Sequence, residues 1–446
     1  MLEARILKIL LGFLLVLAVF NGFYKLGHSR IQRWDEATNA RVLAETMALP
    51  QPWFLQHEGE GFFEKPPLWY YLSMASSQLF GLSRFSLRLV SALSGLGILA
   101  VLVYLVYRES GFKPVLFAGF GWLGIRHLYF PVWASTHQLR SADTDFLQLF
   151  LIMLGFLVCY TWLRVRAWET KTGYAYACIL GLLTGLAWLA KGPLAILTFL
   201  SIGSFCLLYY QKIGLGKAAI FQAFLVLFVF LLAILPWHYL MHSRYGTLFW
   251  TAYWDYHLVA RYLQALEGHI HPVWYYLGIL TRVRYYFWGG GLFLILLMHF
   301  GLLQLTVLWD CLCMKRCHSH GNLKTVPFFG QYKETAIQKK APSMPASLYY
   351  RFCLFFFPAA ILLIISSAET KLPWYVIPVY PFAMGLLAYY FAKLTNQWQK
   401  LVLAAVIGLA LYNSYQIARL PWEPTFSCYQ VRDCPEHLEE VVGGVR

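Results

Sequence analysis

Long, continuously apolar runs separated by polar loops recur along the whole chain. Each run is close to the ~20 residues that a helix needs to cross ~30 Å of hydrocarbon. A membrane β-barrel would instead alternate apolar and polar positions over strands of ~10 residues. The pattern therefore predicts an all-α integral membrane protein, because helices satisfy their own backbone hydrogen bonds in lipid. It predicts about eleven spans, near residues 6–26, 84–107, 114–133, 144–163, 174–190, 192–210, 218–236, 286–309, 350–368, 374–393 and 400–418.

Two connecting segments, 27–83 and 237–285, are too long to be simple turns. Within the first, the stretch from Asp35 to Met47 places apolar side chains at helical spacing, and aromatic residues suited to the headgroup zone follow it. We expect two helices in 27–83 that lie on the membrane surface rather than cross it. The segment 237–285 is similarly rich in Trp, Tyr, His and Arg.

Composition and charge agree with this topology. Of the 446 residues, 59% are hydrophobic and 13% are charged, whereas soluble domains carry roughly 25% charged residues. The formal net charge of +15 is explained by short basic loops that fix the orientation and by basic groups that meet anionic lipid headgroups or phosphates, since no nucleic-acid-binding module is recognisable. We therefore expect no nucleic-acid partner.

The same loops predict a multi-pass protein of the cell (inner, cytoplasmic) membrane with a cytoplasmic N-terminus. The first apolar run is interpreted as an uncleaved span, because it lacks a small-residue cleavage site. We expect one transmembrane domain, 1–418, with a cytoplasmic loop 310–345 and an extracytoplasmic tail 419–446. Cys428 and Cys434 of the tail could pair in an oxidising compartment. On this topology most acidic residues also fall on the extracytoplasmic side of the membrane.

Asp35 and Glu36 follow the first span directly. Two acids at a helix start can simply stabilise the helix dipole. Alternatively, one of them is a general base or a metal-facing carboxylate. The residues alone leave both interpretations open.

Glu64 and Lys65 precede two prolines, Pro66 and Pro67, with Tyr70 one turn later. The prolines favour a rigid extended entry and a helix that begins at the second of them. A Glu and a Lys on such a corner can face opposite ends of one polar ligand. The alternative is a surface ion pair worth ~0–1 kcal/mol.

Asp143 and Asp145 open the fourth span, with Arg140 one turn earlier. An acid at the mouth of a span is costly unless it faces protein or water, although the helix N-terminus offsets part of that cost. Lys191 stands beside Gly192 and a proline between two spans. It either snorkels to the interface or binds a phosphate at an unwound corner.

His257 and Arg261 are four residues apart and share one face if this stretch is helical. Lys371, with Tyr375 after it, places another cation at the outer membrane edge. A lone His is often structural, but one His and one Glu can complete an open metal site with water and phosphate oxygens. We expect the inner group Cys311, Cys313, Cys317, His318 and His320 to be thiols without zinc, because its spacing differs from the usual paired knuckle.

These acids, cations and aromatics converge on one outer membrane edge. Several cations beside carboxylates at the headgroup level suit a lipid-linked phosphate whose leaving charge must be stabilised. The spacing by itself predicts nothing more specific.

An ordered set of motifs resembles the superfamily of aminoarabinose transferases and protein O-mannosyltransferases, which are membrane glycosyltransferases of the GT-C class. The resemblance covers residues 1–395 or so. It rests on Asp35-Glu36-Ala37, Phe63-Glu64-Lys65-Pro66-Pro67-Leu68-Trp69-Tyr70, Arg88-Leu89-Val90-Ser91-Ala92-Leu93, Thr144-Asp145, Lys191-Gly192-Pro193, Pro236-Trp237, His257 with Arg261, Pro272-Val273-Trp274-Tyr275-Tyr276 and Thr370-Lys371-Leu372-Pro373-Trp374-Tyr375.

The resemblance implies a GT-C bundle that transfers a sugar from a polyprenyl-phosphate donor to a lipid, glycan or protein acceptor on the extracytoplasmic face. Inversion at C1 by a single displacement is the implied mechanism. By this resemblance, Asp35 is catalytic and Asp145 supports it. The cations that would bind the donor phosphate are Lys65, Lys191, Arg261 and Lys371. Glu64 and His257 would hold a divalent metal (Zn, Mg or Mn). We add Glu36 to the catalytic candidates, and Tyr70, Arg140 and Tyr375 to the substrate-binding candidates.

One departure from the family pattern affects this hypothesis. The family commonly has an Arg three residues after the first Asp, where this chain has Thr38, and Arg41 is the nearest cation on that stretch. Two alternatives remain beside the transferase, and the second of them rests on this departure. One is a transporter or flippase of polyprenyl-phosphate lipids, which would need polar groups near the middle of its membrane-spanning helices. The other is an inactive binding or assembly subunit.

Overall fold

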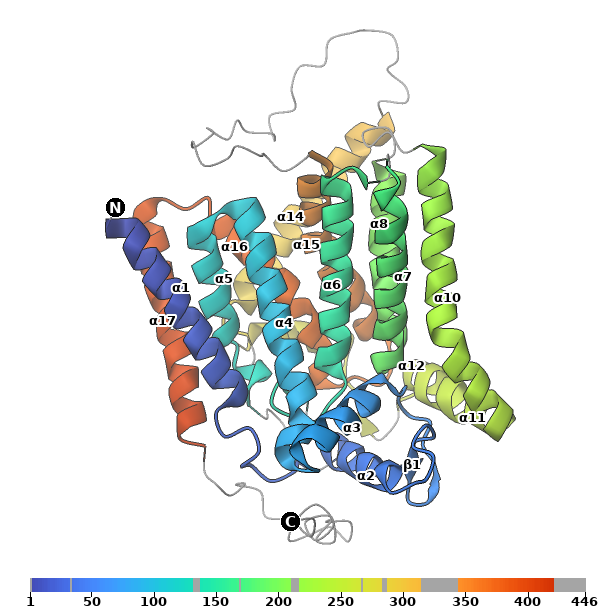
Figure 1. The fold of residues 1–446 in the computed structure, drawn as a ribbon. Coiled ribbons are helices and arrows are strands. Elements are labelled where there is room, and N and C mark those ends of the chain that lie inside the picture. Colours follow the sequence, from blue (N-terminus) through green and yellow to red (C-terminus); the bar gives the residue numbers. More distant parts are fainter. Residues whose placement is uncertain are drawn as a thin grey trace.

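The computed structural model describes residues 2–32, 34–130, 137–167, 170–209, 216–265, 268–282, 287–313 and 344–420. In these ranges the chain is a bundle of long helices that run side by side (Figure 1). Eight helical segments of the described part are long and apolar enough to cross a membrane. They lie in α1(Leu2–Phe23), α4(Arg84–Ser110), α6(Asp145–Arg164), α7(Thr172–Lys191), α10(Lys217–Tyr245), α15(Met344–Ser367), η7(Pro373–Val379) with α16(Tyr380–Phe391), and α17(Asn396–Ala418).

Shorter apolar helices occupy the three other predicted spans. They are α5(Phe112–Leu123), η3(Pro193–Ile196) with α8(Leu197–Leu208), and the apolar part Gly290–Leu302 of α14(Gly290–Cys313). The all-α membrane bundle is thus confirmed, whereas eleven crossings stay a prediction. The span expected over 114–133 is shorter as a helix, because α5 ends at Leu123 and η1(Arg126–Leu128) follows.

Helix α10 extends beyond the predicted end at residue 236. It continues through Pro236 to Tyr245. The proline removes one backbone hydrogen bond, but Trp237 and Met241 of the extension are buried against Phe249. This aromatic packing explains why the helix does not stop at the proline.

Helices α7 and α10 pack closely through glycine. A Cβ atom at Gly181 would lie 2.5 Å from the carbonyl oxygen of Val226. Only a residue without a side chain allows this approach of two backbones, a common device in membrane helix pairs.

The predicted surface helices of the first long segment both form. They are α2(Asp35–Met47) and α3(Leu68–Phe80), joined by a hairpin of β1(Gln56–His57) and β2(Glu60–Gly61) with Gln56 opposite Gly61. Val42 and Leu43 of the expected apolar stripe are fully buried. Both helices lie at the same end of the bundle (Figure 1). Their position at a membrane surface stays a prediction.

The second long segment folds into short pieces at this same end. These are α11(Thr247–Trp250), the π-helix η4(Thr251–Ala260), α12(Arg261–Leu263) and α13(Tyr275–Thr281). The backbone of Arg261 and His269 accepts hydrogen bonds from Thr370 and Lys371. An isolated bridge between Ile270 and Thr370 continues this contact. It fixes α12 beside the segment that leads into η7.

Several predicted features lie outside the described residues. They are Cys317, His318 and His320, most of the loop 310–345 and the tail from residue 421, which includes Cys428 and Cys434. The division into a domain 1–418 and a tail stays a prediction.

Candidate active site

Asp35 is the first residue of α2 and the centre of the site. Its Oδ1 accepts a hydrogen bond from Lys65 Nζ at 2.5 Å, and its Oδ2 lies 3.0 Å from His137 Nε2. Burial alone would raise the pKa of Asp35, but Lys65 and then His137 outweigh it and hold the pKa well below the usual value. The carboxylate is therefore ionised throughout the neutral range.

His137 joins Asp35 to a second pair of acids. Its Nδ1 contacts the carboxylates of Asp143 and Asp145, and its ring stacks on Trp374 with 4.1 Å between centroids and 14° between planes. Burial would lower the pKa of His137, but these three carboxylates raise it to about 10. The ring is therefore an imidazolium at neutral pH.

Asp145 and Lys191 complete the group across two helices. Asp145 is the first residue of α6 and Lys191 the last of α7, so antiparallel packing brings them to the same end of the bundle. Lys191 Nζ lies 2.5 Å from Asp145 Oδ1. Gly192 then has φ +114°, which provides the unwound corner that the sequence predicted.

These residues form what we call the charged cluster: Asp35, Lys65, His137, Asp143, Asp145 and Lys191. Three carboxylates face three basic groups in a buried setting. Such a cluster is tolerated because its charges pair with one another. Residues far apart in the sequence thus meet at one place, as their motifs predicted.

The corner at Lys65 and Tyr70 is held by Asn39 of α2. The Tyr70 hydroxyl donates to Asn39 Oδ1 at 2.6 Å, and Lys65 Nζ lies 3.4 Å from the same oxygen. Asn39 Nδ2 in turn donates to the carbonyl oxygen of Ala142 at 2.9 Å. Asn39 therefore connects Lys65 and Tyr70 to the loop before α6.

Sequence reasoning missed two residues of this site, His137 and Asn39. The only local signal for His137 is its position eight residues before Asp145 in the polar entry to a span. Asn39 gives a weaker signal, one helical turn after Asp35 on the expected helix.

Glu36 faces away from the charged cluster. Its carboxylate pairs with Arg88, with Oε1 2.8 Å from Nε, and accepts a hydrogen bond from the Ala142 amide at 2.9 Å. Arg88 also donates to the carbonyl oxygens of Leu26 and Ser29 at 2.9 Å. The side chains of Glu36 and Arg88 are each 1% exposed. This geometry favours a structural role in place of the catalytic role expected of Glu36.

Arg140 and Lys371 also contact backbone rather than the charged cluster. Arg140 donates to the carbonyl oxygens of Asn21 at 2.7 Å and Tyr24 at 2.6 Å, which stabilises the C-terminal end of α1. Lys371 Nζ donates to the carbonyl oxygen of Ala368 at 2.5 Å, just after α15. Their expected binding roles stay untested, and these contacts favour helix capping.

Glu64 and Arg261 both lie close enough to His257 to influence its pKa. Burial lowers the pKa of His257, the carboxylate of Glu64 opposes this, and Arg261 and Lys65 lower the pKa further. Arg261 also hydrogen-bonds the hydroxyl of Tyr375. The site thus extends from the charged cluster through Glu64 to the π-helix, a rare geometry that often marks functional sites.

Arg41, the nearest cation to the position where the family has Arg, does not reach the charged cluster. It pairs with Glu45 at 2.9 Å and with Glu58 at 2.6 Å. The departure at Thr38 is therefore not compensated by Arg41.

Among the described residues, one group has the arrangement of a metal site. His137, Asp143 and Asp145 offer ligand atoms within 4.8 Å of one another. In this structure His137 and Asp145 also contact Asp35 and Lys191. The sequence assigned the metal to Glu64 and His257 instead.

No protein-family profile matches the chain. Curated relatives do match part of it. The undecaprenyl phosphate-α-4-amino-4-deoxy-L-arabinose arabinosyl transferase of Pseudomonas aeruginosa strain UCBPP-PA14 is 26% identical over 281 residues, 60% of this chain and 47% of that protein. One such transferase of Pseudomonas fluorescens is 28% identical over 272 residues, with the same coverage of 60% and 47%. The chain therefore spans about half the length of these relatives.

Solved structures share the fold over most of the chain. ArnT from Cupriavidus metallidurans, bound to undecaprenyl phosphate, matches with a TM-score of 0.62 and 20% identity, covering 92% of this chain and 66% of that one. The oligosaccharyltransferase AglB from Archaeoglobus fulgidus, in complex with an inhibitory peptide and a dolichol phosphate, matches with a TM-score of 0.54, 13% identity and coverage of 92% and 55%. The chain is thus similar in sequence to aminoarabinose transferases over about half of their length, and it shares the fold of ArnT and AglB, as its motifs predicted.

Proposed function

We propose that this protein is a glycosyltransferase that moves a sugar from a polyprenyl-phosphate donor to a lipid, glycan or protein acceptor. The observation that carries the proposal is the charged cluster, in which an ionised Asp35 lies between Lys65 and His137. The relatives named above act on undecaprenyl-phosphate-linked aminoarabinose or bind polyprenyl phosphates. They give no support to the alternative of a transporter.

In the proposed reaction, the acceptor oxygen or nitrogen attacks C1 of the sugar as the bond from C1 to the phosphate oxygen breaks. Asp35 accepts a hydrogen bond from the acceptor and takes its proton as the new bond forms. Its low pKa means that this transfer follows the development of charge on the acceptor. A single displacement inverts the configuration at C1.

The leaving phosphate needs positive charge beside it. Lys65 and Arg261 both lie close enough to His257 to lower its pKa. Lys191 is joined to the charged cluster by its contact with Asp145. Fixed cations at a leaving oxygen lower the barrier by ~3–4 kcal/mol each. We assign these three residues to the donor phosphate.

A divalent metal fits the pair Glu64 and His257. Nδ1 of His257 is buried, and no hydrogen-bond partner faces it among the described residues. A carboxylate oxygen and a free imidazole nitrogen are ligands that zinc accepts, with water and phosphate oxygens in the open positions. The metal would supply further positive charge at the phosphate.

The proposed setting is the cell membrane, with the charged cluster on the extracytoplasmic side and the N-terminus in the cytoplasm. The distribution of short basic loops supports this orientation. A cysteine introduced at exposed Glu60 should react with a membrane-impermeant maleimide in intact cells, and protection until lysis would reverse the orientation.

The transfer assay uses the purified full chain with a labelled undecaprenyl-phosphate aminoarabinose and a lipid A acceptor, and measures release of undecaprenyl phosphate. Asp35→Asn should lower the rate by about 10²–10⁴-fold. It also removes a charge partner of Lys65 and His137 and should lower the unfolding temperature, so the rates are compared at a temperature at which the variant is folded. The matched control is Glu60→Gln, an exposed acid on the neighbouring hairpin. Full activity of Asp35→Asn would refute the catalytic assignment. A wild-type chain that binds donor without releasing phosphate, across a panel of acceptors, would favour the inactive subunit.

A further inference from the structure

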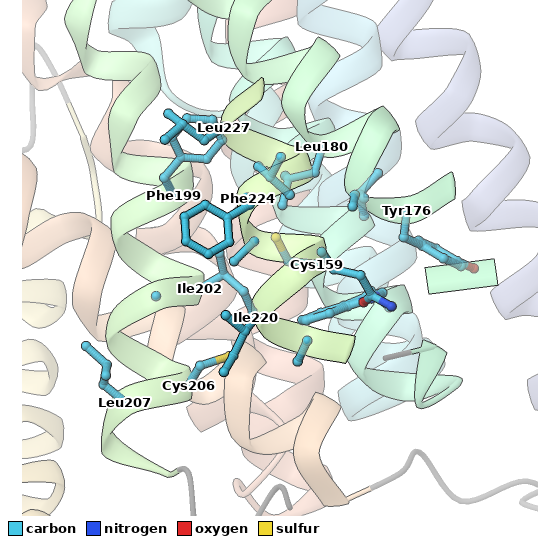
Figure 2. A pocket seen from close by; sticks show the side chains of 18 of the residues that line it. Cys159, Tyr176, Leu180, Phe199, Ile202, Cys206, Leu207, Ile220, Phe224 and Leu227 are labelled. Atoms are coloured by element: carbon cyan, nitrogen blue, oxygen red, sulfur yellow. The ribbon is translucent and has the colours of Figure 1, made fainter. Parts of the chain in front are cut away.

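A cavity of about 550 Å³ lies between α6, α7, α8 and α10, away from the charged cluster (Figure 2). Asp145 begins α6 and Lys191 ends α7, whereas the cavity is lined by Cys159 near the other end of α6 and Tyr176 near the start of α7. The cavity is therefore at the opposite end of the bundle. The proposed transferase reaction does not use it.

The packing of the four helices shapes this lateral cavity. Helix α8 packs on α15 through a hydrogen bond of 2.9 Å between Ser201 and Tyr349, while α10 packs on α7 through Gly181. Helices α8 and α10 meet where Phe199 contacts Phe230, with 5.1 Å between ring centroids. Phe199 lines the cavity near the start of α8, on the side towards the charged cluster.

On its other side the cavity opens to the surface of the bundle. Leu207 is 82% exposed and Phe224 66% exposed, and both line it. In a membrane protein this surface is covered by lipid. The volume lies within the ~300–1,000 Å³ usual for bound small molecules, and the lining is almost entirely apolar.

One residue that lines the cavity, Gln222, has a buried side-chain amide without a hydrogen-bond partner among the described residues. Gln222 is 1% exposed, and neither its amide nitrogen nor its amide oxygen has a hydrogen-bond partner among the described residues. A buried amide of this kind is costly unless a ligand satisfies it. Gln222 packs against Gly173, because a Cβ atom there would lie 2.3 Å from its Nε2. Gln222 therefore sits near the start of α7 rather than at mid-membrane.

Positive charge surrounds this end of the cavity. Lys171 immediately precedes α7 and Lys217 begins α10, and both are exposed. The N-termini of these two helices add positive partial charge. Basic residues at helix ends attract anionic lipid headgroups.

We infer that the lateral cavity binds one acyl chain of an anionic phospholipid, with Gln222 hydrogen-bonded to its ester group and Lys171 and Lys217 beside its phosphate. The acyl chain occupies the apolar volume, and the unpartnered amide hydrogen-bonds the ester group. The two lysines favour a negatively charged headgroup. The protein would then hold a lipid of the leaflet opposite the charged cluster.

Native mass spectrometry of the purified full chain tests this site. Phosphatidylglycerol and phosphatidylcholine with identical acyl chains are added at equal concentration. The wild type should retain about tenfold more phosphatidylglycerol, as expected for two lysines near the headgroup. Lys171→Gln with Lys217→Gln should remove the preference, and Lys400→Gln, an exposed lysine of α17, should keep it.

Filling the cavity tests the acyl-chain position. A side chain at Gly203 would enter open space, and Gly203 lines the cavity. Gly203→Phe should lower retention of both lipids about tenfold. Gly12→Phe on α1, where a Cβ atom also meets open space, is the matched control. If Gly203→Phe does not fold, Gln222→Met should still lower retention several-fold.

Equal lipid retention by Gly203→Phe and Gly12→Phe would overturn the proposal. So would displacement of the phospholipid by an equal concentration of undecaprenyl phosphate, because the occupant would then be an isoprenoid. Both readouts are independent of sugar transfer. Loss of transferase activity therefore cannot produce or hide either result.

Discussion

The side chains of Asp35 and Glu36 leave α2 in different directions, because consecutive residues of an α-helix are about 100° apart. Asp35 faces Lys65 and His137, and Glu36 faces Arg88. The sequence could not separate these roles, since both residues are acids at the same helix start. What separates them is Arg88, 52 residues later, whose position depends on the packing of α4.

Glu36→Gln should destabilise the protein without a specific effect on chemistry. It leaves the buried guanidinium of Arg88 without its counter-charge, which costs about 3–5 kcal/mol. Thermal unfolding in detergent measures this loss, and Glu60→Gln should change stability by less than about 0.5 kcal/mol. A Glu36→Gln protein with normal stability and no transfer would assign Glu36 to catalysis instead.

His137 should make stability depend on pH in the alkaline range. Its folded-state pKa of about 10 lies above the ordinary 6.5. A raised pKa gives stability that is complete below pH 6.5 and is lost as the pH rises towards 10. The difference in unfolding temperature between the wild type and His137→Gln should therefore shrink from pH 7 to pH 10. A difference that stays constant over this range would mean that the ring is already neutral in the folded protein at pH 7.

At the scale of helices, local patterns predicted most elements and missed those set by packing. The α2 helix begins and ends at the predicted residues, Asp35 and Met47. The π-helix at His257 was not predicted, because the sequence was compared only with the period of 3.6 residues per turn of an α-helix. A π-helix has more residues per turn. The extension of α10 past Pro236 also depends on partners distant in sequence, such as Phe249.

Gly181→Ala should weaken the contact between α7 and α10. The added methyl group would lie 2.5 Å from a backbone oxygen of α10, so the helices must move apart. We expect a loss of about 1–3 kcal/mol, as for other overpacked contacts, measured by thermal unfolding. Gly12→Ala has open space and serves as the control. Equal stability of the two variants would contradict the close packing described here.

At the scale of the whole molecule, the bundle brings three separate stretches of chain to one place. Asp35 and Lys65 come from the first long segment, His137 from the loop before α6, and Lys191 from the end of α7. The motifs and the family resemblance predicted that most of these residues converge. They did not predict His137 as the bridge, because its role depends on the distance between two loops that only the packed bundle sets.

The same arrangement explains why some predicted cations are absent from the charged cluster. Arg140 and Lys371 were candidates because they stand at the outer edge of spans. In the folded chain they donate to carbonyl oxygens at the ends of α1 and α15. A basic residue at a membrane edge can bind a phosphate or donate to the carbonyl oxygens at a helix end. Its position in the sequence does not decide between these two roles.

The binding position of a polyprenyl phosphate is the strictest test of the proposed active site. Electron cryomicroscopy of the purified chain with undecaprenyl phosphate should show the phosphate within hydrogen-bonding distance of Lys65 and Arg261, with Asp35 open to the acceptor side. A phosphate bound away from the charged cluster, or a map in which Asp35 and Lys191 line separate surfaces, would contradict the account.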